Sequence, residues 1–292
     1  MMKKNLLLTA LVAGAVACEA ANAQNMPGWS QPQKPFKVFG NTYYVGTRGL
    51  SSILITSDQG HVLIDGAIPE AAQQIAANVR ALGFKLEDVK LILNSHVHFD
   101  HAGGIAELQK LSGAVVAGSP IAAKVLNAGP VGTDDPQYGT IQAIAPATNV
   151  RVFKDKETQR VGSLAITPHL TPGHTPGGTS WTWQSCENQQ CLNIVYADSL
   201  NPISAPGYQY TASSRKPTGQ QQLEQSFAAL EGLSCDVMLT PHPELADLFA
   251  KLQRKEGGDA NAFRGAPACA QYVETYRGKL RDRVNQEIRP QK

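Results

Sequence analysis

The 292-residue sequence has little net charge, because 26 lysines and arginines nearly balance 24 aspartates and glutamates to give +2. A chain so nearly neutral carries no broad basic surface, so we expect no nucleic-acid partner. No apolar run reaches the roughly 20 residues that a membrane-spanning helix needs. Charged residues make up only 17% of the chain and hydrophobic residues 42%, which excludes a disordered protein and indicates a globular one.

Cysteine is also scarce, with five residues, and none of them forms a Cys-x-x-Cys pair. This absence argues against a structural zinc site built from cysteines. An odd number of cysteines also requires an explanation for the one that is left over.

The first 23 residues read as a secretory signal peptide. Residues 1–4 are a short basic start, residues 5–17 are mostly apolar and small, and Ala21-Asn22-Ala23 is a cleavage pattern. Cleavage after Ala23 removes Cys18 and leaves residues 24–292, which we expect to form a single domain in the periplasm, because no linker divides them. The alternative is lipoprotein processing and anchoring at Cys18, since residues 15–18 loosely resemble a lipoprotein cleavage box.

The four remaining cysteines form an even set, which in an oxidising compartment favours disulfide bonds. Three pairings are possible for four cysteines. Cys186 and Cys191 flank a short turn between two strand-like runs, so a bridge across that turn is the local prediction. That bridge leaves Cys235 to pair with Cys269.

Hydrophobic periodicity predicts an α/β chain. Apolar runs predict strands at residues 43–45, 52–56, 61–65, 89–94, 114–117, 150–153, 164–167, 179–183, 194–197 and 237–240. Apolar positions spaced three and four apart predict helices at about 68–82, 104–111, 220–230 and 268–286. Residues 27–37 are predicted as an extended arm and residues 129–139 as a loop. Two clusters of strands, with helices between and after them, indicate a layered α/β fold with sheet packed on sheet.

The histidines carry the functional signal. Directly after a buried-type strand, four potential metal ligands fall within six residues: His96, His98, Asp100 and His101. Alternate side chains of an extended segment point the same way, so His96 and His98 can reach one ion. Asp100 and His101 continue into the next helix, where they can face a second ion. Because imidazole and carboxylate groups suit zinc, this spacing predicts a zinc site.

Two further histidines complete the predicted ligand set. Proline and glycine flank His174, and prolines flank His242, which fixes the backbone and presents one side chain at each position. Six ligands that hold two metals form a hydrolytic centre, because zinc lowers the pKa of bound water to about 7. His61 and His169 are left outside this set, the first as a surface residue and the second as a structural one.

This set of residues resembles that of the metallo-β-lactamase superfamily. The motif His96-x-His98-x-Asp100-His101, followed by His174 and His242, carries the resemblance, and the Leu-Ile-Asp-Gly sequence of residues 63–66 is similar to the family's opening motif. The resemblance covers nearly all of the mature chain. It implies a four-layer αββα sandwich, in which two mixed sheets are flanked by helices.

Within the superfamily, the sequence resembles the subclass B3 β-lactamases. The resemblance implies two Zn²⁺ per chain, the first held by His96, His98 and His174 and the second by Asp100, His101 and His242. It also implies hydrolysis of the β-lactam amide of penicillins, cephalosporins and carbapenems by a metal-bound hydroxide, which gives antibiotic resistance. Asp100 is then the catalytic residue that orients the hydroxide and passes a proton. The pairing of Cys235 with Cys269 is like the disulfide of that group.

Substrate recognition is assigned to the segment after residue 197. Many hydrolases of the superfamily, such as glyoxalase II, use an aspartate in this strand-end motif to bridge the two metals, and here that residue is Asp198. The B3 resemblance instead favours Ser199, near the second zinc. Ser199, Asn201 and Ser204 are candidates either to bind the substrate carboxylate or to cap turns. Hydrophobic residues at 145–153 and 208–210 are candidates either for the pocket wall or for packing.

Other functions share part of this pattern. An exported hydrolase of the same fold that acts on a lactone or a thioester would share all six metal ligands, so discrimination rests on the loops and on Asp198. A non-catalytic periplasmic zinc-binding or signalling module is a different class, and the ordered pair of sites argues against it. The expected partner is a small-molecule β-lactam substrate, and the expected oligomeric state is a monomer.

Overall fold

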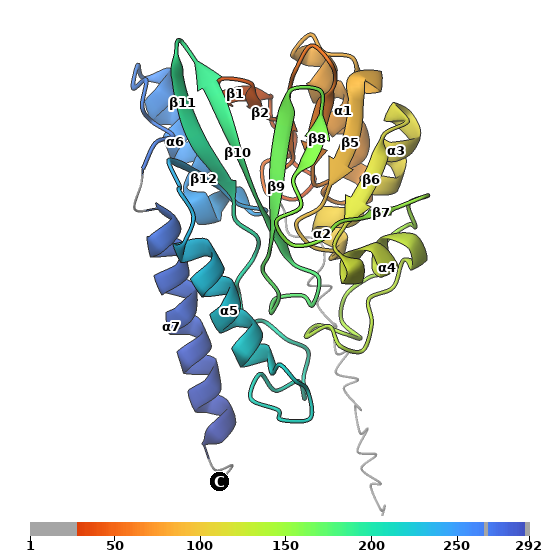
Figure 1. Cartoon of the computed structure of the whole chain (residues 1–292), viewed down its shortest axis with the longest axis vertical. Coiled ribbons are helices and arrows are strands. Elements are labelled where there is room, and N and C mark those ends of the chain that lie inside the picture. The colour runs from red at the N-terminus through yellow and green to blue at the C-terminus, as the bar shows by residue number, and fades with distance from the viewer. Residues whose placement is uncertain (1–27, 266–267, 290–292) are drawn as a thin grey trace, which may run out of the picture.

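In residues 28–265 and 268–289, which the computed structural model describes, two sheets pack face to face and helices cover the outer face of each sheet (Figure 1). The fold is therefore the predicted four-layer α/β sandwich. Within these residues, no helix is long and apolar enough to cross a membrane. The predicted signal peptide, residues 1–23, and Cys18 lie outside the described residues.

The first sheet combines an antiparallel and a parallel half. Its strands lie in chain order: β1 (Phe36–Phe39), β2 (Thr42–Tyr44), β3 (Ile53–Ile55), β4 (His61–Ile64), β5 (Val89–Leu93), β6 (Val115–Gly118) and β7 (Arg151–Val152). Neighbours from β1 to β4 pair antiparallel, and neighbours from β4 to β7 pair parallel. The parallel half needs crossover helices, which cover its outer face.

The second sheet is mainly antiparallel. It contains β8 (Gln159–Val161), β9 (Leu164–Leu170), β10 (Thr179–Glu187), β11 (Gln190–Tyr196) and β12 (Val237–Leu239), in the spatial order β12-β11-β10-β9-β8. β11 and β12 pair parallel, and the other neighbours pair antiparallel. Both sheets are therefore mixed, as the resemblance implies.

The helices cover the two outer faces, except that α6 packs against the core between the sheets through Leu248, Phe249 and Leu252. They are α1 (Ala72–Ala81), α2 (Phe99–Ala102), α3 (Ile105–Ser112), α4 (Pro120–Ala128), α5 (Gly219–Glu231), α6 (Leu248–Glu256) and α7 (Ala268–Ile288), with 3₁₀ turns η1 (Pro69–Ala71), η2 (Leu86–Asp88) and η3 (Pro243–Ala246). In Figure 1, α1, α3 and α4 lie on the side of the first sheet, and α5 and α7 run side by side on that of the second.

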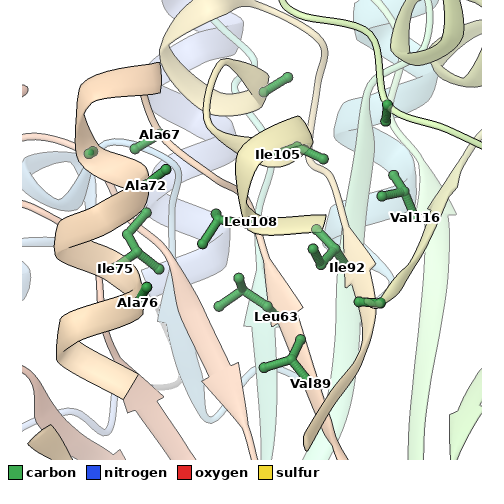
Figure 2. Packing of buried hydrophobic residues seen from close by; sticks show 14 of the residues in the cluster. Leu63, Ala67, Ala72, Ile75, Ala76, Val89, Ile92, Ile105, Leu108 and Val116 are labelled. Carbon is green, nitrogen blue, oxygen red and sulfur yellow. The ribbon is translucent and has the colours of Figure 1, made fainter. Parts of the chain in front are cut away.

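Strand alternation divides the buried residues between two cores. In β4, Val62 and Ile64 face the second sheet, whereas Leu63 between them faces the helices. Both faces of the strand are buried, as expected for the parallel part of a covered sheet. Figure 2 shows the helix-facing core, in which Leu63, Val89, Ile92 and Val116 from the sheet meet Ala67, Ala72, Ile75, Ala76, Ile105 and Leu108 from the chain around α1 and α3. These contacts fix the strand ends from which the functional loops leave.

Several elements differ from the sequence prediction: β8 and α6 have no predicted counterpart, and β1 and α4 show why short elements were missed. β1 includes Phe36 and Lys37, which were expected in an extended arm, because Phe36 pairs with Tyr44 of β2. α4 was not expected, although its start signal is present: Ser119 caps the helix by accepting a hydrogen bond from Ala122 N, and Pro120 occupies the first turn. β1 and α4 are both short, so the parts of the chain that they pair with or pack against determine their structure more than their own hydrophobic periodicity does.

Two disulfide bonds join Cys186 to Cys191 and Cys235 to Cys269, as predicted. The bonded cysteines are 5 and 34 residues apart in sequence, so the two bridges close loops of very different size. Restricting the unfolded chain stabilises the fold more for the longer loop, by about 4 kcal/mol, and for the shorter loop by about 2 kcal/mol.

Replacing Cys235 and Cys269 together with alanine is therefore expected to cost more stability than replacing Cys186 and Cys191 together. Urea unfolding of the two double variants beside the wild type measures both losses. An equal loss, or a larger loss for the hairpin bridge, would contradict this account of the disulfides.

Candidate metal centre

Loops that follow strands of both sheets bring the six predicted ligands together. The segment after β5 and the adjoining α2 carry His96, His98, Asp100 and His101; the β9–β10 loop carries His174; and the residues after β12 carry His242. The backbone of the β9–β10 connection also joins the first segment directly, because Thr179 N donates to Ser95 O at 2.8 Å. The two sheets thus place distant parts of the sequence around one point.

Three histidines form the first ligand group. The ligand atoms of His96, His98 and His174 all lie within 4.8 Å of one another. The ring centroid of His96 is 4.8 Å from that of His98 and 4.8 Å from that of His174, and all three side chains are buried. Three imidazoles are thus packed around one buried point, as the sequence predicted.

Each histidine of this group has one ring nitrogen within hydrogen-bond distance of an oxygen behind it. His96 Nδ1 lies 2.7 Å from Asp198 Oδ1, and His174 Nδ1 donates to the carbonyl of Asn201 at 2.8 Å. His98 Nε2 lies 3.2 Å from both carboxylate oxygens of Asp135. A proton on these nitrogens leaves the lone pair of the other nitrogen available, which is the arrangement that orients histidine ligands for a metal.

Of the remaining ring nitrogens, His98 Nδ1 lies 3.5 Å from Gln137 Nε2, and His96 Nε2 fits a metal ion most clearly. His96 Nε2 is buried and has no hydrogen-bond partner among the described residues. A buried polar atom without a partner is costly, and a bound cation would satisfy it. Neutral imidazole nitrogens are preferred zinc ligands, so the donor set matches zinc.

Asp100, His101 and His242 form the second ligand group. Asp100 Oδ2 lies 3.1 Å from His101 Nε2 and 3.3 Å from His242 Nε2, and the two nitrogens are 3.2 Å apart. Zinc bonds of 2.0–2.1 Å in a tetrahedral shell separate ligand atoms by roughly 3.3 Å. The three atoms therefore have the spacing of one face of such a shell. The two ligand groups adjoin each other, because the ring centroid of His101 is 4.4 Å from that of His96.

A buried carboxylate supports the segment that carries both groups. Asp65 follows β4 and accepts hydrogen bonds from Ser95 N at 2.7 Å, Ser95 Oγ at 2.6 Å, Asn94 Nδ2 at 3.0 Å and Tyr196 OH at 2.7 Å. Ser95 directly precedes His96, so this network holds the backbone from which His96 projects. The sequence placed Asp65 in a motif but assigned it no role.

Burial and neighbouring charges set the protonation states of the ligands. Burial, reinforced by His98, lowers the pKa of His174 to about 3. Burial, followed by the nearby His101 and His98, holds the pKa of His96 well below its usual value. Burial alone would raise the pKa of Asp100, but His101 and hydrogen bonds from His101 and His242 hold it well below its ordinary value. Neutral imidazoles and an ionised carboxylate are the forms that bind zinc, which His96, His174 and Asp100 have; at His242 burial lowers the pKa but the Asp100 carboxylate outweighs it and raises the pKa.

The three predicted substrate-binding residues follow β11. Ser199 is buried, with 4% of its surface exposed. Asn201 contributes its backbone carbonyl to His174. Ser204 Oγ accepts a hydrogen bond from Arg283 Nη2 at 2.9 Å. Of the residues expected at a pocket wall or in packing, Tyr210 is fully buried in the core beside α5 and α7, so it packs.

The two histidines left outside the ligand set lie outside both groups. His169 is structural as predicted, since its Nε2 lies 2.9 Å from Thr182 Oγ1 on the neighbouring strand. The prediction that His61 lies at the surface was wrong, because only 6% of it is exposed. Phe84 packs edge-on against the His61 ring at 5.0 Å, and Ser57 N donates to its Nδ1, so a distant part of the chain covers it.

Asp135 is the functional residue that sequence reasoning missed. It lies in the expected loop 129–139 and is 2% exposed, whereas its neighbour Asp134 is exposed. The two aspartates are indistinguishable by type and spacing, and only the folded loop shows which one meets His98. Asp198 was considered as a metal-bridging residue, and its Oδ1 contacts the outer nitrogen of His96.

Comparisons with known proteins agree with this geometry. The family model of the metallo-β-lactamase superfamily matches residues 45–186. The solved structure of the Rm3 metallo-β-lactamase is 53% identical, with a TM-score of 0.87 over 90% of this chain and 97% of that chain. MEM-A1, a subclass B3 metallo-β-lactamase isolated from a soil metagenome library, is 49% identical, with a TM-score of 0.86 over 89% and 98% of the two chains.

A curated relative with another name also matches. The hydroxyacylglutathione hydrolase of Anaeromyxobacter dehalogenans is 30% identical over 131 residues, which are 45% of this chain and 41% of that protein. The chain spans between 34% and 55% of the length of the curated relatives that it matches. The solved structures, in contrast, are covered almost completely. From this coverage and identity, the chain belongs to the metallo-β-lactamase superfamily and resembles its subclass B3 members.

Proposed function

We propose that this chain is a zinc-dependent β-lactamase that hydrolyses the amide bond of penicillins, cephalosporins and carbapenems and so gives antibiotic resistance. The observation that carries the proposal is the pair of adjacent ligand groups in a chain that matches solved metallo-β-lactamases over almost their whole length. We further propose export to the periplasm, where β-lactams are encountered, and a monomeric enzyme.

Two Zn²⁺ ions per chain are proposed, one in each ligand group. His96 Nε2, His98 Nδ1 and His174 Nε2 would hold the first, because the other nitrogen of each ring donates to an oxygen. Asp100 Oδ2, His101 Nε2 and His242 Nε2 would hold the second. Zinc in such a site lowers the pKa of a bound water to about 7, which supplies a nucleophile at neutral pH and positive charge beside the carbonyl oxygen.

The chain's own residues would orient the reaction. Asp100 is ionised, because the neighbouring histidines keep its pKa low despite burial, so it can accept a hydrogen bond from the attacking water. The same carboxylate can then hold the proton and pass it to the amide nitrogen as that nitrogen leaves. Asp198 and Asp135 keep two of the histidines in the ligand tautomer, so the site is organised before substrate enters.

The segment after β11 would receive the substrate carboxylate. Ser199, Asn201 and Ser204 are the proposed contacts, as the sequence suggests. At Ser204, the Arg283 guanidinium donates to the hydroxyl oxygen and leaves the hydroxyl hydrogen free to donate onward. A donated hydrogen bond from a cation strengthens the hydroxyl as a donor, which suits an anionic substrate group.

Ring opening tests this proposal directly. The mature chain, residues 24–292, is incubated with a penicillin, a cephalosporin and a carbapenem, with and without a zinc chelator. Hydrolysis that the chelator abolishes is expected for at least one of them. Absence of chelator-sensitive ring opening for all three would overturn the proposal.

A matched pair of histidines separates the metal site from general effects of substitution. His174→Ala is expected to lower kcat/KM by about 10³-fold, because it removes a ligand of the first group and the charge stabilisation that depends on it. The control is His169→Ala, five residues earlier, which is expected to keep near-wild-type activity. The His169 side chain makes its hydrogen bond to Thr182 on the neighbouring strand and belongs to neither ligand group. Near-wild-type turnover by His174→Ala would contradict the ligand assignment.

A second candidate function is hydrolysis of a lactone or thioester by the same centre. The match to a hydroxyacylglutathione hydrolase favours it, although that match covers less than half of either protein. Assaying a glutathione thioester and an acyl lactone beside the three β-lactams distinguishes the two. Chelator-sensitive turnover of a thioester or lactone, with none of the β-lactams, would favour this second function.

A further inference from the structure

A continuous set of hydrogen bonds links the C-terminal helix α7 to the first ligand group. It runs through residues 197–218, which connect β11 to α5 without a helix or strand of their own. A connection of this length needs external anchors to hold one conformation. The same segment carries Asp198 and Asn201, whose oxygens accept the hydrogen bonds that orient His96 and His174. Any displacement of the segment would therefore move two ligands.

Arg283 of α7 forms hydrogen bonds with the middle of this segment. Its Nη2 donates to Ser204 Oγ and to the carbonyl of Tyr208, each at 2.9 Å. Its Nε donates to Glu287 Oε1 at 2.8 Å, one helical turn further on. The guanidinium therefore joins a candidate substrate contact, the loop backbone and the helix through three directed bonds.

Glu287, also on α7, forms hydrogen bonds with the next part of the segment. Its carboxylate accepts hydrogen bonds from Tyr210 N, Thr211 N and Thr211 Oγ1, each at 2.9 Å. Burial alone would raise the pKa of Glu287, but the bonds from Arg283, Tyr210 and Thr211 keep it below its ordinary value.

A second ion pair, between Arg277 of α7 and Glu231 of α5, provides a more exposed pair for comparison. The Glu287 side chain is only 6% exposed, whereas that of Glu231, which pairs with Arg277 nearer the start of the helix, is 44% exposed. Exposed pairs of this kind contribute little to stability. In the Arg283–Glu287 pair the carboxylate is therefore covered by the loop while the Arg283 side chain is 29% exposed, and the Arg277–Glu231 pair is a surface contact between α7 and α5.

Two further contacts extend the connection to all three histidines. At the start of α7, Tyr272 OH donates to the carbonyl of Asp198 at 3.0 Å. Ala205 N donates to the carbonyl of Pro136 at 2.8 Å, beside Asp135, which orients His98. The oxygens behind the whole first ligand group therefore belong to two loops that are joined to each other, and α7 anchors one of them.

We propose that Arg283 and Glu287, the α7 clamp, are positioning residues that set the orientation of the first ligand group and of the Ser204 hydroxyl. They act through residues 197–218, because their hydrogen bonds go to that segment and to each other and to none of the six proposed ligands. The effect on metal affinity follows from the hydrogen bonds alone. The effect on substrate binding rests on the proposed function.

The test compares two ion pairs that involve α7: Arg283–Glu287 within the helix and Arg277–Glu231 between α7 and α5. Arg283→Met and Glu287→Gln remove the clamp, Arg283→Lys keeps its charge, and Arg277→Met and Glu231→Gln are the matched controls. Metal-free proteins are titrated with zinc against a chromophoric chelator, and kcat and KM for a penicillin are measured with zinc in excess. Thermal unfolding of each variant records the loss of stability separately.

The clamp variants are expected to weaken one zinc-binding step by about tenfold, as loss of outer support for metal ligands does. KM is expected to rise more than kcat falls, Arg283→Lys to lie between wild type and Arg283→Met, and both controls to keep wild-type values. Clamp variants with wild-type zinc affinity and KM, whatever their melting temperature, would overturn the proposal. If the wild type opens none of the three β-lactams, the proposed function fails, and the zinc titration alone still decides the role of the clamp.

Discussion

Replacing Asp100 with asparagine is expected to lower kcat for β-lactam hydrolysis by about 10³-fold and to reduce the zinc content from two ions per chain toward one. Asp100 Oδ2 is the atom that lies within 3.3 Å of both His101 Nε2 and His242 Nε2. Asparagine keeps the shape of the side chain, but it removes the negative charge that a cation in this group requires. It also removes the acceptor for the proton of the attacking water.

The control for this variant is Asp134→Asn, which makes the same chemical change at an exposed position of the loop beside Asp135. Initial rates with a penicillin and metal analysis of the dialysed proteins measure both effects. An Asp100→Asn enzyme with two bound zinc ions and near-wild-type kcat would show that Asp100 has neither of the roles assigned to it.

Replacing Asp65 with alanine is expected to lower the free energy of unfolding by about 3–5 kcal/mol. The Asp65 side chain is fully buried and accepts four hydrogen bonds, from Ser95, Asn94 and Tyr196. Alanine would leave these donors buried without an acceptor. Because Ser95 precedes His96, zinc affinity is expected to fall together with stability.

Asp58→Ala is the control, since Asp58 is exposed in the turn before β4. Urea unfolding of the metal-free proteins isolates the structural cost from the contribution of bound zinc. A loss below 1 kcal/mol for Asp65→Ala would mean that this network supports neither the fold nor the metal-binding segment in the way proposed.

The sequence indicates the candidate ligands because the spacing of most of them is local. His96, His98, Asp100 and His101 lie within six residues after a strand, so strand geometry alone indicates that they face a common point. His174 and His242 are marked by the prolines and glycines around them. The strands also follow from composition, since a run such as residues 89–94 is apolar at most positions and is buried except at Lys90.

The supporting residues could not be predicted in the same way, because their roles depend on which loops meet. Asp135 and Asp134 are neighbours of the same type, and only the contact with His98 distinguishes them. His61 was wrongly placed at the surface, because the ring of Phe84 that covers it comes from the turn after α1. The α7 clamp links residues more than 70 positions apart, so no local pattern could reveal it.

Zinc reconstitution tests the central claim most directly. The mature chain is stripped of metal with a chelator, dialysed, and titrated with zinc while the initial rate of penicillin hydrolysis is followed. The account predicts no measurable hydrolysis without metal and a rate that rises with added zinc and levels off at two equivalents per chain. Full hydrolysis by the metal-free chain, or a zinc-loaded chain that leaves the β-lactam ring intact, would contradict it.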